Sequence, residues 1–121
     1  MKIPQTRHVA LAFFMLSSAG EAIAQDVDAA FRRRCASCHA LEEGVNRTGP
    51  SLANIFGRTA GTLEGARYSS AMRDADFIWD KASLDAFLEA PRSVVPGTSM
   101  AASVRNAEER SSIIEFLSDR P

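Results

Sequence analysis

The sequence predicts a small all-α domain with long loops. Apolar residues recur at helical spacing in several segments, whereas no segment alternates polar and apolar residues as a half-buried strand would. Glycine and proline punctuate the stretches between these segments, above all 44–65 and 94–102. A loop as long as 44–65 is unusual in a compact domain, and wrapping a large flat ligand would explain it.

The first two of about four expected helices lie in the first half of the domain. The first helix is predicted over residues 27–37, where Val27, Phe31 and Cys35 are spaced by four and therefore share one face. The second is short and is predicted over residues 70–74.

Two clearer helices follow. The third begins after the N-cap Asp80, carries apolar residues at helical spacing and stops before Pro91. The fourth begins after Asn106, and Glu109 stands where a capping box places its acidic partner. Its apolar face consists of Ile113, Ile114, Phe116 and Leu117.

The N-terminus reads as a secretory signal peptide covering residues 1–24. Lys2 and Arg7 give the positive start, residues 9–16 are apolar, and Ala22-Ile23-Ala24 is a cleavage site. The apolar run falls short of the roughly 20 residues that span a bilayer, so no stable membrane insertion is expected. An uncleaved N-terminal anchor is the alternative. A single domain, 25–121, remains after cleavage.

Export and charge restrict the possible functions. Cleavage removes two basic residues and one acidic residue, which changes the net charge from −1 to −2. That balance gives no reason to expect nucleic acid or an anionic membrane as a partner. The remaining 97 of 121 residues form a marginal core, so a buried ligand would have to supply apolar surface.

The most informative motif is Cys35-Ala-Ser-Cys38-His39, because CxxCH is the attachment sequence of a c-type haem. Both thiols would form thioethers and His39 would bind the iron, giving one haem c per chain. A thioredoxin-like disulfide is an alternative, but the flanks show no strand pattern. A zinc site is another, but it needs a fourth ligand beyond the three Cys and His side chains left after cleavage.

The candidates for the second iron ligand can be reduced by elimination. His39 is the only histidine outside the signal peptide, and the only lysine there, Lys81, lies in a predicted helix. A methionine or an open site is left. Met72 falls in the short second helix, whereas Met100 follows Pro96-Gly97 in a loop that can direct its thioether at a metal. Met100 is therefore predicted as the metal ligand opposite His39.

His/Met ligation is typical of an electron carrier and not of an enzyme. A thioether favours Fe(II) and raises the reduction potential, and two protein ligands keep substrates off the iron. No catalytic residue is therefore predicted. We also expect the haem-free chain to be largely unfolded.

At this point the mature chain resembles the class I cytochromes c, in particular the bacterial soluble type that is similar to mitochondrial cytochrome c. The resemblance covers residues 31–117 and implies the small all-α cytochrome c fold, with long loops around one covalent haem and crossing N- and C-terminal helices. The segments that carry it are 35–39, 48–52, 55–61, 68–72, 84–88, 96–100 and 113–117, together with Phe31, Trp79 and Pro91.

The family implies a role for further residues. Pro50 follows the family position whose carbonyl accepts a hydrogen bond from the ligand histidine, and Leu52 packs on the haem. Hydrogen bonds to the haem propionates come from Arg58, Tyr68 and Trp79. Thr98 hydrogen-bonds within the loop of Met100.

Three positions depart from the family. Val27 replaces a glycine at the helix crossing. Phe87 replaces a tyrosine beside the haem, and Met72 replaces an asparagine. The last two changes are expected to shift the reduction potential.

The function implied is that of a monomeric periplasmic electron carrier. Its donor would be a quinol-oxidising complex or a dehydrogenase, and its acceptor an oxidase, a reductase or a photosynthetic centre. Arg34, Arg47 and Arg92 could form the docking surface for these redox partners, or be solvated charges. The alternatives are a haem peroxidase or gas sensor with a labile Met100, and a redox subunit of a larger enzyme.

Overall fold

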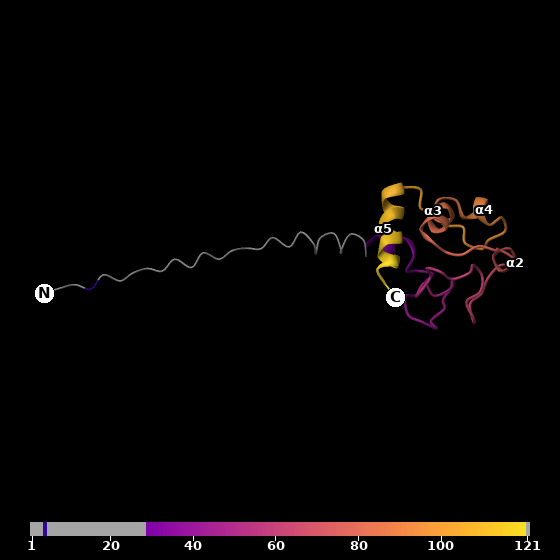
Figure 1. Ribbon diagram of the computed structural model, residues 1–121, viewed down its shortest axis with the longest axis horizontal. Helices are drawn as coiled ribbons and strands as arrows, with labels where there is room; N and C mark the ends of the chain where they lie inside the picture. The colour runs from indigo at the N-terminus through magenta and orange to yellow at the C-terminus, as the bar shows by residue number, and fades with distance from the viewer. Residues whose placement is uncertain (1–3, 5–28, 121) are drawn as a thin grey trace.

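Short helices joined by long loops make up the part of the chain that the computed structural model describes, namely residue 4 and residues 29–120 (Figure 1). Residues 29–34 are helical. The helices α2 (Ser70–Arg73), α3 (Lys81–Glu89), α4 (Pro91–Val94) and α5 (Ala107–Ser118) follow in order. The predicted all-α fold is confirmed. Apart from residue 4, the predicted signal peptide lies outside the described residues, as does Val27.

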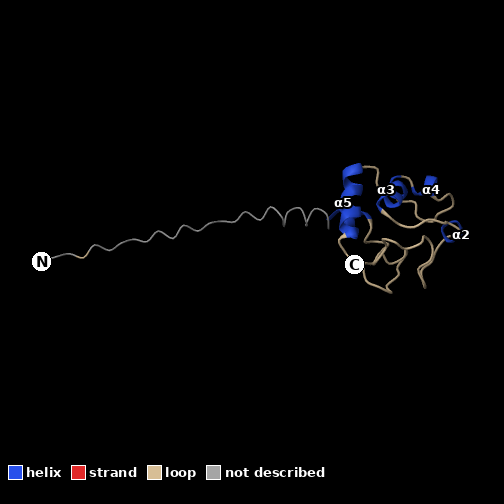
Figure 2. Ribbon diagram, in the orientation of Figure 1, coloured by secondary structure: helices blue, strands red, loops and turns tan. Residues whose placement is uncertain are grey.

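Loops account for the middle of the described chain, as Figure 2 shows in tan. Within residues 29–120 the only β pairing is an isolated antiparallel bridge between Thr59 and Ile78. Two further backbone bonds extend this contact, since Trp79 N donates to the Arg58 carbonyl at 2.9 Å and Gly57 N to the Trp79 carbonyl at 2.8 Å. The long loop is thereby held against the segment that precedes α3.

The N-caps predicted for α3 and α5 are present. Asp80 accepts a hydrogen bond from the Ser83 amide at 2.8 Å, and the Ser83 hydroxyl accepts from the Asp80 amide at 2.8 Å, which completes a capping box. At α5, Asn106 Oδ1 accepts from the Glu109 amide at 2.8 Å. Each bond satisfies an N–H group that the first helical turn leaves unpaired.

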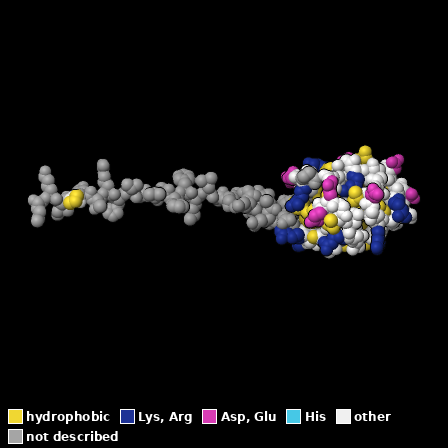
Figure 3. Space-filling model, turned by 90° about the horizontal axis from the view of Figure 1, so that it is seen from below, with side chains coloured by type: hydrophobic (Ala, Val, Ile, Leu, Met, Phe, Trp, Pro, Cys, Tyr) yellow, Lys and Arg dark blue, Asp and Glu magenta, His cyan; other side chains and the backbone are white. Residues whose placement is uncertain are grey.

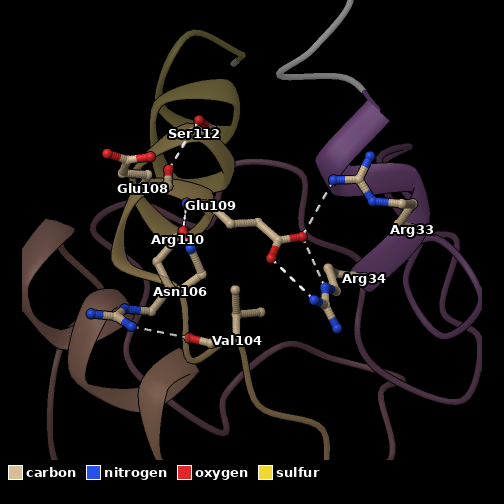
Figure 4. Close-up of polar contacts among 8 residues, drawn as sticks. All are labelled: Arg33, Arg34, Val104, Asn106, Glu108, Glu109, Arg110 and Ser112. Carbon is tan, nitrogen blue, oxygen red and sulfur yellow. Dashed lines mark hydrogen bonds and ion pairs between the residues drawn. The ribbon is translucent and has the colours of Figure 1, made fainter.

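The prediction that the third helix stops before Pro91 is confirmed, since α3 ends at Glu89. The helix α4 begins at Pro91 and was not predicted, because proline also suits the first position of a helix. The capping box predicted at Asn106 was wrong. The carboxylate of Glu109 does not complete a capping box. It instead accepts hydrogen bonds from Arg34 at 2.9 and 3.1 Å and from Arg33 at 3.4 Å (Figure 4).

The crossing of the first and last helices brings the two ends of the described chain together. The rings of Phe31 and Phe116 lie 5.1 Å apart between centroids, at an interplanar angle of 37°. The pair of Arg33 and Arg34 with Glu109 joins the same two helices at the surface (Figure 4). The predicted contact of Phe31 with the apolar face of α5 is confirmed.

The apolar faces of α3 and α5 form much of the core. Leu84, Phe87 and Leu88 of α3 are buried, as are Ile113, Ile114, Phe116 and Leu117 of α5. Among residues 29–120, no helix combines the length and the apolar character that a bilayer-crossing segment needs.

Candidate functional site

A cavity of about 360 Å³ lies between the helices and the long loops. All eleven candidate site residues predicted from the sequence line it: Cys35, Cys38, His39, Pro50, Leu52, Arg58, Tyr68, Trp79, Phe87, Thr98 and Met100. These residues come from segments far apart in the chain, so the fold gathers them around one space.

The two cysteines and the histidine lie on a tight turn that follows the first helical segment. The amides of Cys38 and His39 both donate to the Cys35 carbonyl, at 3.1 and 2.9 Å. Both cysteines are free thiols, Cys35 buried and Cys38 exposed. Burial, reinforced by the negative charge of Glu109, raises the pKa of the Cys35 thiol to about 11. The turn therefore presents two thiols and an imidazole to the same cavity.

His39 is held in one tautomer. Its Nδ1 lies 2.7 Å from the Pro50 carbonyl oxygen, which can only accept, so Nδ1 carries the proton. The accepting carbonyl is thus that of Pro50 itself, and not that of the residue before it, as was expected from the resemblance. Burial lowers the pKa of His39, although the bond to Pro50 partly opposes this shift. The ring is consequently neutral at pH 7, and Nε2 keeps a free lone pair for a metal.

Gly49 makes room for the His39 ring. A Cβ atom at this position would lie 2.3 Å from His39 Cε1, far inside van der Waals contact. The Gly49 amide also donates to the Cys38 carbonyl at 2.8 Å. A glycine is thus required here for the close approach of the backbone to the ring.

Met100 reaches the cavity from the loop between α4 and α5. Gly97 has a φ of +95°, which allows the chain to turn there. The Thr98 amide then donates to the Val95 carbonyl at 3.0 Å, and the Thr98 hydroxyl accepts from the Met100 amide at 3.4 Å. Met100 is partly buried against the core. Its thioether and the His39 imidazole thus belong to the lining of one cavity.

Arg58 brings a positive charge to the cavity. Its guanidinium donates to the Ser51 carbonyl at 2.9 Å and to the Ala53 carbonyl. Burial lowers the pKa of Arg58, and the nearby Tyr68 partly opposes this. No carboxylate pairs with Arg58 among the described residues, so the site is suited to an anionic group of a ligand.

Trp79 adds a hydrogen-bond donor. The indole is buried and packs edge-on against Phe77 and Phe87, with centroids 4.7 and 5.1 Å apart. Among the described residues, the Trp79 ring nitrogen has no hydrogen-bond partner. Every side-chain nitrogen or oxygen in this part of the chain that is shielded from solvent is hydrogen-bonded, so the ring nitrogen is not shielded. The indole N–H is therefore accessible to whatever fills the cavity.

Sequence reasoning missed several lining residues. Gly49 gave no distinctive signal, because glycine in a loop is common. Missed polar lining residues include Thr48, Arg67, Ser69 and Ser99, and missed apolar ones include Ile55, Leu84, Leu88, Ile113 and Leu117. For the four in α3 and α5, helical spacing predicted burial but could not distinguish the protein core from a ligand surface.

Comparison with known proteins agrees with this arrangement. The model of the family described as "Cytochrome c" matches residues 24–120. The chain belongs to the cytochrome c family. Cytochrome c of Euglena viridis is 43% identical over 88 residues, covering 72% of this chain and 86% of that protein. Cytochrome c2 of Rhodoplanes tepidamans is 40% identical over 98 residues, covering 78% and 92%. Cytochrome c2 iso-2 of Magnetospirillum molischianum is 38% identical over 84 residues, covering 69% and 87%.

Cytochromes c carry covalently bound haem c with its iron and transfer electrons to and from partner proteins. The cavity of this chain fits such a group in three respects. It offers two thiols on one turn, a neutral imidazole whose Nε2 is free, and an apolar lining with a half-buried cation at one side. The predicted family and cofactor are confirmed.

The three candidate docking arginines differ in their contacts. Arg34 is bound by Glu109, and Arg47 donates to the Ala36 carbonyl at 3.0 Å. Arg92 is exposed on α4. Basic and acidic side chains are interspersed over the face seen in Figure 3.

Proposed function

We propose that this cytochrome c is a periplasmic single-electron carrier with a closed His39/Met100 site. The observation that carries the proposal is the shared lining of one cavity by His39, Met100 and both cysteine thiols, with His39 Nδ1 engaged by the Pro50 carbonyl. Cys35 and Cys38 form the thioethers, and one haem c is bound per chain.

His39 and Met100 would hold the haem iron and have complementary properties. The Pro50 carbonyl holds the His39 ring in place and makes its Nε2 more basic. The Met100 thioether is a soft ligand that favours the ferrous state and raises the reduction potential. When bound, the haem iron supplies one reversible electron. With His39 and Met100 both holding the iron, no position would remain for a substrate, so the chain would act as a carrier and not as an enzyme.

The remaining candidate residues position and shield the cofactor. Leu52 and Phe87 line the cavity and would cover the cofactor with apolar side chains. Arg58, Tyr68 and Trp79 bind the propionates, since a buried carboxylate costs several kcal/mol unless it is paired or hydrogen-bonded. The lowered pKa of Arg58 and the accessible indole N–H of Trp79 support this assignment. Thr98 restrains the backbone at Met100.

Two departures from the family adjust the cavity. Phe87 is buried and places an apolar ring where a tyrosine hydroxyl would otherwise hydrogen-bond. Met72 is buried in α2 and adds a second thioether to the lining. Both make the cavity less polar and alter the reduction potential.

The sequence supports a location outside the cytoplasm. Residues 1–24 act as a cleaved signal peptide, and residues 25–121 form the mature monomer. Electrons come from a quinol-oxidising complex or a dehydrogenase and pass to an oxidase, a reductase or a photosynthetic centre. If Arg34, Arg47 and Arg92 steer this docking, the rate of electron exchange falls as salt is added.

The proposal is tested on the exported protein purified from the periplasm. The ferric form should show the sulfur-to-iron charge-transfer band at the red end of the visible spectrum, and the ferrous form should bind CO slowly. A missing band with rapid CO binding would favour a peroxidase or gas sensor. Cleavage after Ala24 is checked by the mass of the mature chain, and a precursor that stays in the membrane fraction would contradict the signal-peptide assignment.

A further inference from the structure

Arg110 is a charged residue that lies in the core. Only 6% of its surface is exposed. It lies on the face of α5 that also carries Ile113 and Leu117. The guanidinium makes three bonds. Nε donates to Asp85 of α3 at 2.8 Å, and one terminal nitrogen donates to the carbonyls of Val104 and Arg105, at 3.1 and 2.9 Å (Figure 4 shows the bond to Val104). A buried charge is tolerated only when it is satisfied in this way.

The Val104 and Arg105 carbonyls lie at the C-terminal end of the loop that carries Met100. Before Met100, the loop is held by the hydrogen bonds of Thr98 and by its burial. After Met100, residues 101–103 make no hydrogen bond within the described part of the chain. The chain is next held at Val104, whose amide donates to the Leu88 carbonyl at 2.7 Å.

We propose that Arg110 is a positioning residue that keeps Met100 in place by holding the far end of its loop against α3 and α5. The inference rests on the proposed ligation by Met100. Only three residues separate Met100 from Val104, so a displacement at Val104 is passed to Met100 along a segment that has no other hydrogen bond. Leu88 and Arg110 therefore fix the same end of the loop, one through the Val104 amide and the other through its carbonyl.

The guanidinium is suited to this position for two reasons. Its planar fork donates to the Asp85 carboxylate and to two carbonyls at once. A lysine ammonium would donate to one of these acceptors, and with a less defined geometry. Its charge is also permanent, and the hydrogen bond to Asp85 raises the pKa of Arg110 further. The loop is therefore held at any pH at which the protein is folded.

The test measures how easily an external ligand displaces Met100. Imidazole is titrated into the ferric holoprotein and into the variants Arg110→Met and Arg110→Lys. Displacement requires the loop to open, so apparent imidazole affinity follows the fraction of open molecules. We expect the affinity to rise about 5- to 30-fold in Arg110→Met, as loss of one or two hydrogen bonds implies. The imidazole affinity of Arg110→Lys should lie between those of Arg110→Met and the wild type.

Two controls separate loop opening from general destabilisation. Phe116→Leu weakens the helix crossing without altering the cavity lining or the loop, and Asp85→Asn disturbs the α3 contact while leaving both carbonyl bonds. Their imidazole affinities should stay within about twofold of the wild type. If Arg110→Met binds imidazole no better than Phe116→Leu at equal unfolding free energy, Arg110 has only a structural role and the inference is overturned.

A second readout covers the case in which Arg110→Met folds poorly. Amide hydrogen exchange in Arg110→Lys should accelerate at Thr98, Met100 and Val104 more than at Ile113 and Ile114 in α5. Equal acceleration at both sets would contradict the inference. A wild-type protein without the sulfur-to-iron band would instead refute ligation by Met100 itself, so the two failures are distinguishable.

Discussion

The Nδ1 atom of His39 lies 2.7 Å from the carbonyl oxygen of Pro50, and the intervening Gly49 has space for no side chain. The hydrogen bond fixes the tautomer, and the glycine allows the ring to approach the backbone closely enough to make it. Orientation of the imidazole therefore depends on a loop residue eleven positions along the chain, and not only on the CxxCH turn.

Gly49→Ala should destabilise the holoprotein by about 1–3 kcal/mol, because a Cβ atom would displace the His39 ring. Gly44→Ala is the control, since that glycine has a φ of +74° but open space around it, and substitution there adds backbone strain alone. Unfolding in urea measures both free energies. A shift in the haem absorption spectrum is expected only for Gly49→Ala. Identical spectra for the two variants would show that the ring tolerates the added methyl group.

The chain without haem should be largely unfolded. An unfilled cavity of 360 Å³ costs up to about 9 kcal/mol at roughly 24 cal/mol per Å³, which is comparable to the whole stability of a small domain. Far-UV circular dichroism of Cys35→Ala/Cys38→Ala lacking haem should show little helix. The same substitutions in protein that retains haem non-covalently serve as the control. Native-like helix content in the haem-free variant would contradict the prediction.

Glu109 should make stability depend on pH. Its hydrogen bond and ion pair with Arg34 lower the pKa of the Glu109 carboxyl, and Arg33 adds to this effect. A folded-state pKa below the unfolded one means that the stabilisation is present above the unfolded pKa of about 4.3 and is lost as pH falls through the folded value. At neutral pH, Glu109→Gln should cost less than about 1 kcal/mol, because the pair is at the surface.

Glu108→Gln is the matched control for this prediction. Glu108 is exposed, lies in the same first turn of α5 and forms no ion pair within the described residues. Urea unfolding should show a lower free energy of unfolding for Glu109→Gln than for the wild type at neutral pH, and no such difference in acid. The decrease for Glu108→Gln should be smaller. A loss that persists unchanged below the folded pKa would mean that the ion pair is not its cause.

Arg58→Gln should lower the reduction potential. The substitution removes a positive charge that lines the cavity, and such a charge favours the reduced, less positive form of the site. The control is Arg73→Gln at the exposed end of α2, which does not line the cavity. Redox titration of both variants gives the comparison. An equal potential for Arg58→Gln and the wild type would place Arg58 outside the electrostatic surroundings of the haem.

Local sequence signals predicted most of the fold. The caps Asp80 and Asn106 mark the starts of α3 and α5, because a cap acts within one turn. Pro91 was interpreted only as a stop, although proline equally begins a helix, and α4 was missed for that reason. The pairing of Thr59 with Ile78 was also missed, because a single bridge between distant segments leaves no alternating pattern.

The site was predictable where chemistry is restrictive. CxxCH and the shortage of other histidines pointed to His39 and Met100, and the resemblance supplied the other candidates. Gly49 and Arg110 were missed because their roles depend on contacts across the fold. Arg110 did carry a signal, since it lies three residues before Ile113 and seven before Leu117, on the buried face of α5.

The most direct test of a closed His39/Met100 site compares Met100→Leu with Met72→Leu, since both thioethers line the cavity and leucine roughly preserves their volume. Absorption spectra and redox titrations are recorded for the ferric and ferrous holoproteins. We predict that Met100→Leu loses the sulfur-to-iron band, binds CO rapidly and has a lowered reduction potential, while Met72→Leu keeps the band. A Met100→Leu protein that retains the band and the wild-type potential would show that Met100 is not the ligand.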